Sequence, residues 1–227
     1  MKRRIIVLPL VMISLLTGCR KNQTLRSDIK QFIASFSLNE ARKTYLDAGY
    51  TRTDISHEND KIIKNIETLT FNIKDLENIA YEYDVKYYEN DVLDTSKSRN
   101  KHVYKEDGQY YLDDNGQASL ITTERIVNNY VTTFFYRQEV ESIHSLGMYL
   151  GDTIKEIIYD MQKYVTIDFE ENTFTYDMPW GVKKDAEGYY FEELLVVDNL
   201  GMTKSCYIKQ SNGIVEMETT ISVYNNI

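Results

Sequence analysis

The chain has 227 residues, of which 35 are acidic and 26 are lysine or arginine, giving a formal net charge of −9. This acidic balance argues against nucleic acid as a partner, because phosphate binding requires basic patches. Two cysteines exclude a framework of several disulfides, so the fold must be stabilised by its hydrophobic core. The length is enough for one ordinary domain with a sizeable core.

The first 18 residues have the pattern of an export signal. Basic residues at 2–4 precede an apolar run from Ile5 to Leu16. The run is too short for a permanent membrane span, which needs about 20 apolar residues, but it fits the apolar region of a signal peptide. The residues 16–19 that follow, Leu-Thr-Gly-Cys, resemble the lipobox of bacterial lipoproteins. The alternative is an ordinary signal peptide that has a cysteine near its end by chance.

The lipoprotein resemblance makes Cys19 the lipid-attachment residue. It implies cleavage before Cys19, a diacylglyceryl thioether on its sulfur, and a cell-membrane location on the extracytoplasmic side. Two acyl chains give stable anchoring. Residues 19–27 would then form a lipidated cysteine with a short basic tether, and residues 28–227 a single domain. Three of the 26 basic residues and no acidic ones lie in 1–18, so the mature chain is still more acidic.

The domain is predicted to open with two helices. Ser27 and Asp28 can cap a first helix that runs through Phe36, because short polar side chains accept hydrogen bonds from free backbone N–H groups. Residues 37–40 fit a capping box, with Ser and Glu three apart. Gly49 is expected to end this second helix.

Residues 60–121 have the period of two that is typical of half-buried strands. Residues 79–87 alternate Ile, Tyr, Tyr, Val and Tyr with polar side chains, which predicts a tyrosine-rich inner face. Asp-Gly at 107–108 and Asn-Gly at 115–116 predict tight hairpin turns. Before this region, Asp54, His57, Glu58 and Asp60 are expected to lie in a solvated loop rather than to bind a divalent cation.

The middle of the chain is predicted to be helical and the last third to be a second antiparallel meander. Apolar residues at three- and four-residue spacing predict helices over 126–135 and after Gly151. Strands are predicted over 165–169, 173–178, 189–198, 202–210 and 214–224. The fold class is therefore α+β, with a curved antiparallel sheet, an open half-barrel of two meanders, packed against a group of helices.

Two passages, Lys101–Tyr111 and Leu195–Lys204, resemble the LolA/LppX-type lipoprotein superfamily. The family commonly has a turn with Asp and Gly between two late strands, where Asp198 and Gly201 stand here. The resemblance implies an open half-barrel with helices in its concave side, and acyl chains or whole lipids held between them. It supplies no ligand residue that can be matched to a position in this chain.

These observations lead to the expectation of a non-catalytic, membrane-anchored module that binds a lipid or other apolar ligand. The residues expected to line such a cavity are Tyr81, Tyr83, Val85, Tyr130, Phe134, Met217 and Ile221. No catalytic motif, metal site or cofactor is predicted, and no protein partner can be named. Cys206 is expected to be a buried, inert thiol. The alternative is a surface interaction or structural lipoprotein with a filled core and no small ligand.

Overall fold

The structure is a computed structural model that describes residues 24–58, 60–135, 148–151, 154–155, 158–159, 162–184 and 188–226. The predicted signal peptide, Cys19 and most of the tether lie outside these residues. The residues predicted to cap the helix after Gly151 lie outside them as well.

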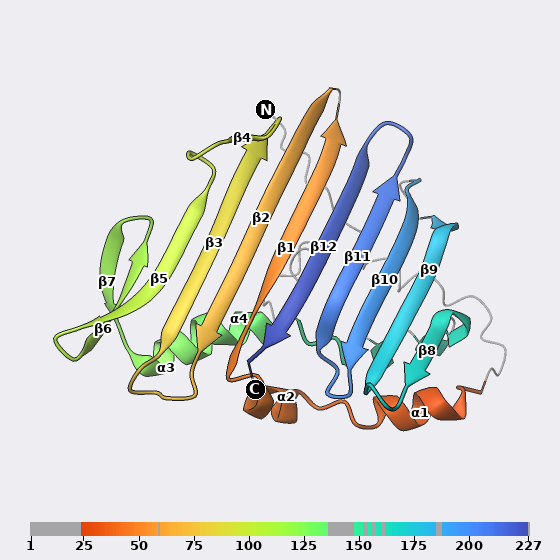
Figure 1. Cartoon of the computed structure of the whole chain (residues 1–227), viewed down its shortest axis with the longest axis horizontal. Coiled ribbons are helices and arrows are strands. Elements are labelled where there is room, and N and C mark those ends of the chain that lie inside the picture. Colours follow the sequence, from red (N-terminus) through yellow and green to blue (C-terminus); the bar gives the residue numbers. More distant parts are fainter. Residues whose placement is uncertain are drawn as a thin grey trace.

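The strands form one antiparallel sheet with the order β7-β6-β5-β3-β2-β1-β12-β11-β10-β9-β8 (Figure 1), and the short β4 pairs with β3 outside this path. The first half comprises β1 (Asp47–Glu58), β2 (Lys61–Asn72), β3 (Ala80–Glu89), β4 (Val92–Leu93), β5 (Arg99–Glu106), β6 (Gln109–Asp114) and β7 (Gln117–Ile121). The second comprises β8 (Val165–Asp168), β9 (Thr173–Lys184), β10 (Tyr190–Asp198), β11 (Thr203–Ser211) and β12 (Glu216–Asn225).

The prediction of an α+β fold with an open antiparallel sheet is confirmed. The two meanders form one continuous sheet because β1 pairs with β12, with Ala48 opposite Asn225 and His57 opposite Glu216. The sheet does not close, since β7 and β8 are its two edges. Alternation in β12 is as predicted: Thr219 is buried, whereas its neighbour Thr220 is exposed.

Helices gather at one end of the sheet, which is the lower end in Figure 1, where β1 begins and β2 ends. They are α1 (Ser27–Ile33), α2 (Leu38–Thr44), α3 (Thr123–Arg125), a π-helical segment (Ile126–Val131), α4 (Thr132–Phe135) and a 3-10 turn (Gln162–Tyr164). The opposite, upper end of the sheet projects beyond these helices (Figure 1). No helix of the described part of the chain is long and apolar enough to cross a membrane.

Two hydrophobic clusters lie between helices and sheet. The first joins α2 and residues 126–135 to the buried side chains of β1–β3 and β5–β7. The second joins α1, Ile154 and Ile158 to β8–β11. Ile221 on β12 packs against both clusters, so the central strands connect the two halves of the core.

Local sequence signals explain several turns and caps. Ser37 caps α2 by accepting a hydrogen bond from the backbone N–H of Glu40, as predicted. Asp107 and Gly108 both have positive φ, which is the geometry of a tight hairpin turn. Asp198 stabilises the β10–β11 turn, because its Oδ1 accepts from the N–H groups of Leu200 and Met202 at 2.9 Å each.

Two predictions near the start of the domain are wrong. Gly49 does not end a helix but lies in β1, where the Tyr224 hydroxyl and the Leu69 carbonyl approach so closely that a Cβ would meet their oxygens at 2.4 and 2.2 Å. Residues 54–58 do not form a loop but are the end of the same strand. The turn between β1 and β2 contains Asp60, which has a φ of 67°.

The helical segments also differ in detail from the prediction. The first helix ends at Ile33 rather than Phe36. The predicted helix over 126–135 is π-helical from Ile126 to Val131 and becomes α-helical at Thr132. The wider turn brings the Thr132 hydroxyl to the carbonyl of Val127, five residues earlier, at 3.0 Å. Such segments are rare and carry i→i+5 bonds.

Candidate functional site

The candidate site is the inner face of the sheet, which we define as the face turned toward the helices. On β1 it carries Tyr50, Arg52, Asp54 and Ser56, since alternate side chains of a strand point the same way. Tyr50 belongs to the first hydrophobic cluster, which identifies this set of side chains as the inner one. The inner face has three zones that differ in chemistry.

The lower zone is apolar and fully packed. Phe134 has no exposed surface and is surrounded by the rings of Tyr45, Tyr50, Phe71 and Phe135, with centroid distances of 6.0, 6.4, 5.1 and 5.1 Å. Aromatic pairs at these separations add to the stability gained from burial alone. Phe134 therefore lies in the centre of the first hydrophobic cluster.

The residues predicted to line a cavity all belong to elements that meet at the inner face. Tyr81 and Tyr130 are in edge-to-face contact, with ring centroids 5.4 Å apart. Tyr83, Tyr130 and Ile221 are partly buried against the first cluster. Val85 and Met217 are half-buried further along β3 and β12, toward the upper end. The structure thus brings the seven residues to one face, at different depths and degrees of enclosure.

The middle zone contains an ion pair between the buried Arg52 and the half-buried Asp54, which was not predicted from the sequence. Arg52 is 4% exposed, and its Nε and Nη2 donate to Asp54 Oδ2 and Oδ1 at 2.8 and 2.9 Å. The Thr219 hydroxyl donates to Asp54 Oδ1 at 2.6 Å. On the neighbouring strand β2, Glu67 Oε1 accepts a hydrogen bond from the Tyr50 hydroxyl of β1 at 2.5 Å. Glu67 lies opposite Arg52 in the β1–β2 register.

A signal for this ion pair was present in the sequence. Arg52 and Asp54 stand at alternate positions after Tyr50, so they share one face if the segment is a strand. Because the residues from Asp54 onward were predicted to form a loop, this shared face was not recognised. Burial of a charged pair is costly unless its geometry is good, which makes its position on the inner face unusual for a purely structural feature.

Cys206 lies on the inner face between Leu195 and Ile221. It is buried, and burial, reinforced by the negative charge of Glu193, raises the pKa of its thiol to about 12. The thiolate is the reactive form of cysteine, so this environment disfavours reaction near neutral pH. The predicted burial of Cys206 is confirmed, and its lack of reactivity stays a prediction.

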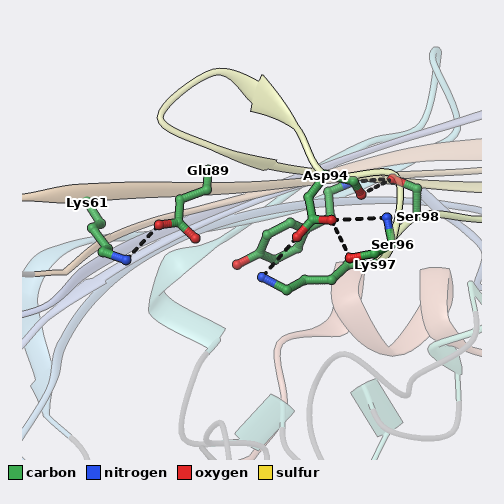
Figure 2. A network of polar contacts seen from close by, with 7 residues as sticks. Lys61, Glu89, Asp94, Ser96, Lys97 and Ser98 are labelled. Carbon is green, nitrogen blue, oxygen red and sulfur yellow. Dashed lines mark hydrogen bonds and ion pairs between the residues drawn. The ribbon is translucent and has the colours of Figure 1, made fainter.

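The upper zone is polar at its margin (Figure 2). Lys61 donates to Glu89 at 2.6 Å, and the side chain of Asp94 accepts from both the N–H and the hydroxyl of Ser96. The Lys97 ammonium lies 3.2 Å from Asp94 and 4.2 Å from the ring centroid of Tyr87. The hydrogen bond from Lys61 lowers the pKa of Glu89. These contacts order the β4–β5 turn beside the inner face.

Exposed apolar side chains are found at the hairpins of the upper end. Val92 is 70% exposed beside β3, and Ile214 is 76% exposed between β11 and β12. Trp180 on β9 is 45% exposed. The lower end, by contrast, is covered by the helices (Figure 1).

The described residues contain no group of three or more His, Cys, Asp or Glu side chains that could hold a metal ion. His57 is exposed on β1, and His102 Nδ1 lies 3.4 Å from the side-chain oxygen of Asn100. His144 lies outside the described residues. On the inner face, the structure brings ionisable groups together in the Arg52 ion pair and at the upper margin.

No family model matches the chain, and no curated protein matches it in sequence. Among solved structures, a porin-like protein from Bacteroides uniformis matches at 12% identity and a TM-score of 0.23, over 78% of this chain and 60% of its own. A β-barrel-like protein of the domain of unknown function DUF1849 from Brucella abortus matches at 8% identity and a TM-score of 0.26, over 81% and 100%. The chain thus spans 60% of the porin-like protein's length and is distantly similar in structure to β-barrel-like proteins.

Proposed function

We propose that this chain is an extracytoplasmic lipoprotein, anchored in the cell membrane through a lipid on Cys19, that binds a lipid or other apolar ligand at the inner face of its sheet. The observation that carries the proposal is the gradient of enclosure along β2 and β3 on that face. Leu69 and Tyr81, toward the lower end, are buried, whereas Val85 and Ile63 toward the upper end are only half-buried, as is Met217 on β12. Half-buried apolar side chains on the face turned toward the helices are what an apolar ligand would cover.

The proposal includes the resemblance of the chain to the LolA/LppX-type superfamily, whose members hold acyl chains between sheet and helices. We also propose that the protein is non-catalytic and has neither a cofactor nor a nucleic acid partner. The Asp198–Gly201 turn, which carries that resemblance, has a structural role here, since Tyr45 of the α2 C-terminus donates to Asp198 at 2.6 Å. The turn fixes α2 against the lower end of the sheet.

Native mass spectrometry of the protein released from cell membranes tests the binding of a ligand. A co-purifying lipid, displaced when Met217 and Ile208 are both replaced by the larger Trp, is the expected result. Loss of wild-type adducts in repeated preparations would contradict it. The anchor is tested separately with an alkyne-tagged fatty acid supplied to cells: wild-type protein should be labelled, whereas the Cys19→Ala variant should not.

The exposed apolar tips of the upper end favour a second candidate, a surface lipoprotein that binds another protein. Val92 and Ile214 are the most exposed large apolar side chains among the described residues. In this case the double Val92→Ser and Ile214→Ser variant would lose a specific partner in cross-linking experiments, while lipid adducts would be absent from wild type and variant alike.

A further inference from the structure

Arg52 is buried, and its guanidinium has more N–H donors than it has hydrogen bonds. An arginine side chain has five N–H donors in a fixed planar arrangement. Arg52 donates two hydrogen bonds, from Nε and Nη2, and both go to Asp54. No described residue accepts a hydrogen bond from Nη1. Leaving buried donors without acceptors costs free energy, so an arginine in this position calls for a further acceptor.

The surroundings of Nη1 indicate that such an acceptor can reach it. Among the described residues, Asn225 Oδ1 is the one side-chain polar atom that is both fully enclosed and without a partner. Nη1 of Arg52 is therefore not fully enclosed, although the residue as a whole is 4% exposed.

The position of Arg52 relates this donor to the apolar part of the face. In the sheet register Arg52 lies opposite Ile221, and Met217 lies four residues back along β12, a distance of about 13 Å at the usual strand rise. A chain-like apolar group that contacts Met217 would thus begin at the guanidinium and extend toward the upper end. Val85 lies level with Arg52 on β3, with Glu67 of β2 between them, so the half-buried residues and the free donor share the inner face.

The charge of the pair restricts the chemistry of the acceptor. The Asp54 carboxylate, held in bidentate contact, already neutralises Arg52. A further anion would add an uncompensated charge to a poorly hydrated site, which is costly. An uncharged oxygen would complete the donor set without that cost.

We propose that Arg52 is a ligand-binding residue that donates from Nη1 to an uncharged oxygen, an ester carbonyl or a hydroxyl, of an amphiphile whose chain lies along the inner face. Asp54 and Thr219 are positioning residues that hold the guanidinium in place. This inference rests on the proposed function and names the class of ligand: glycerol esters of fatty acids are favoured over free fatty acids, which are anionic.

The test uses membranes isolated from cells that produce the full chain. They are incubated with a photoactivatable monoacylglycerol or with a photoactivatable fatty acid of the same chain length, irradiated, and the purified protein is assayed for adducts. Wild-type protein should be labelled more strongly by the monoacylglycerol, and the adducts should map to peptides of β1 and β12.

The informative variant is the double replacement Arg52→Met with Asp54→Leu, which removes both charges and so leaves no unpaired ion in the core. Labelling by the monoacylglycerol should fall about tenfold, as expected for the loss of a charge-assisted hydrogen bond. Arg52→Lys, which keeps the charge but has fewer donors, should fall between the two. Lys209→Met with Glu218→Leu, an ion pair between β11 and β12 on the opposite face of the sheet, is the matched control and should retain wild-type labelling.

Three outcomes would overturn the inference. Equal labelling of wild type and the Arg52 double variant, with both folded by thermal denaturation, would mean that ligand binding does not use Arg52, although lipid binding itself would stand. Preference of wild type for the fatty acid would mean that the acceptor is charged. Absence of labelling with either probe would refute the proposed function as well.

Discussion

Replacing Phe134 by Ala should be the most damaging single truncation in the first hydrophobic cluster. The ring has no exposed surface, and four aromatic neighbours surround it with centroids 5.1–6.4 Å away. Truncation of a fully buried phenylalanine costs about 3–5 kcal/mol, because the lost transfer free energy is added to that of an unfilled cavity. For a domain of this size each kcal/mol lowers the melting temperature by about 2–4 °C, so the total decrease is about 6–20 °C.

Urea and thermal unfolding of the mature chain, followed by circular dichroism, measure this effect. Phe134→Leu keeps most of the volume and should lose about 1–2 kcal/mol. Met217→Ala is the matched control on the same face, and because Met217 is half-buried its loss should stay below about 2 kcal/mol. A loss under about 1 kcal/mol for Phe134→Ala would refute the reasoning, since it would mean that Phe134 faces space already open to solvent or ligand.

Four further predictions address the corrected and confirmed features. Gly49→Ala should destabilise the fold by about 1–3 kcal/mol in chemical denaturation. Removing the Tyr224 ring as well should not rescue it, because the new Cβ still meets the backbone oxygen of Leu69 at 2.2 Å, so the losses of the two substitutions should add in the double variant. Gly108→Ala should cost only about 1 kcal/mol in the same measurement, since its Cβ would meet nothing within 4 Å and only the positive φ opposes it. Tyr45→Phe should lower the free energy of unfolding by about 1.5–3 kcal/mol, because it removes a hydrogen bond to the Asp198 carboxylate; an unchanged free energy of unfolding would contradict this assignment. The pKa of the Cys206 thiol is about 12 in the folded protein and 9.0 ordinarily, so its contribution to stability is fully present below about pH 9 and is lost as the pH rises toward 12. Because the thiol is buried, a thiol reagent at pH 8 should modify Cys206 only in urea. Fast modification of the native protein would contradict the burial.

The sequence predicted those elements whose inner side chains are apolar. In β3 and β12 hydrophobic and polar residues alternate, so the period of two was visible and the inner side chains were assigned correctly. The tight turns were equally visible, because Asp107-Gly108 and Asn115-Gly116 adopt the positive φ values that such pairs allow. These features depend on neighbours along the chain, which a sequence displays directly.

The β1 strand was missed because the inner side of its second half is polar. Arg52, Asp54 and Ser56 occupy positions where apolar side chains would have revealed a strand, and their burial is stabilised by an ion pair and by Thr219 from a distant strand. The pairing of β1 with β12 was not predictable either, since it depends on contacts between the two ends of the domain. The candidate site was thus predicted in its apolar part and missed in its polar part.

The central position of β12 has a consequence for folding. The β1–β12 pairing joins segments at opposite ends of the domain, and closing so long a loop is slow. Each meander has its own hydrophobic cluster, so both halves can gain local structure before this pairing forms. We therefore expect a two-phase folding reaction in which the slow phase reports the formation of the central pairing, and a chain lacking β12 would remain as two separate sheets with an unpaired edge on each.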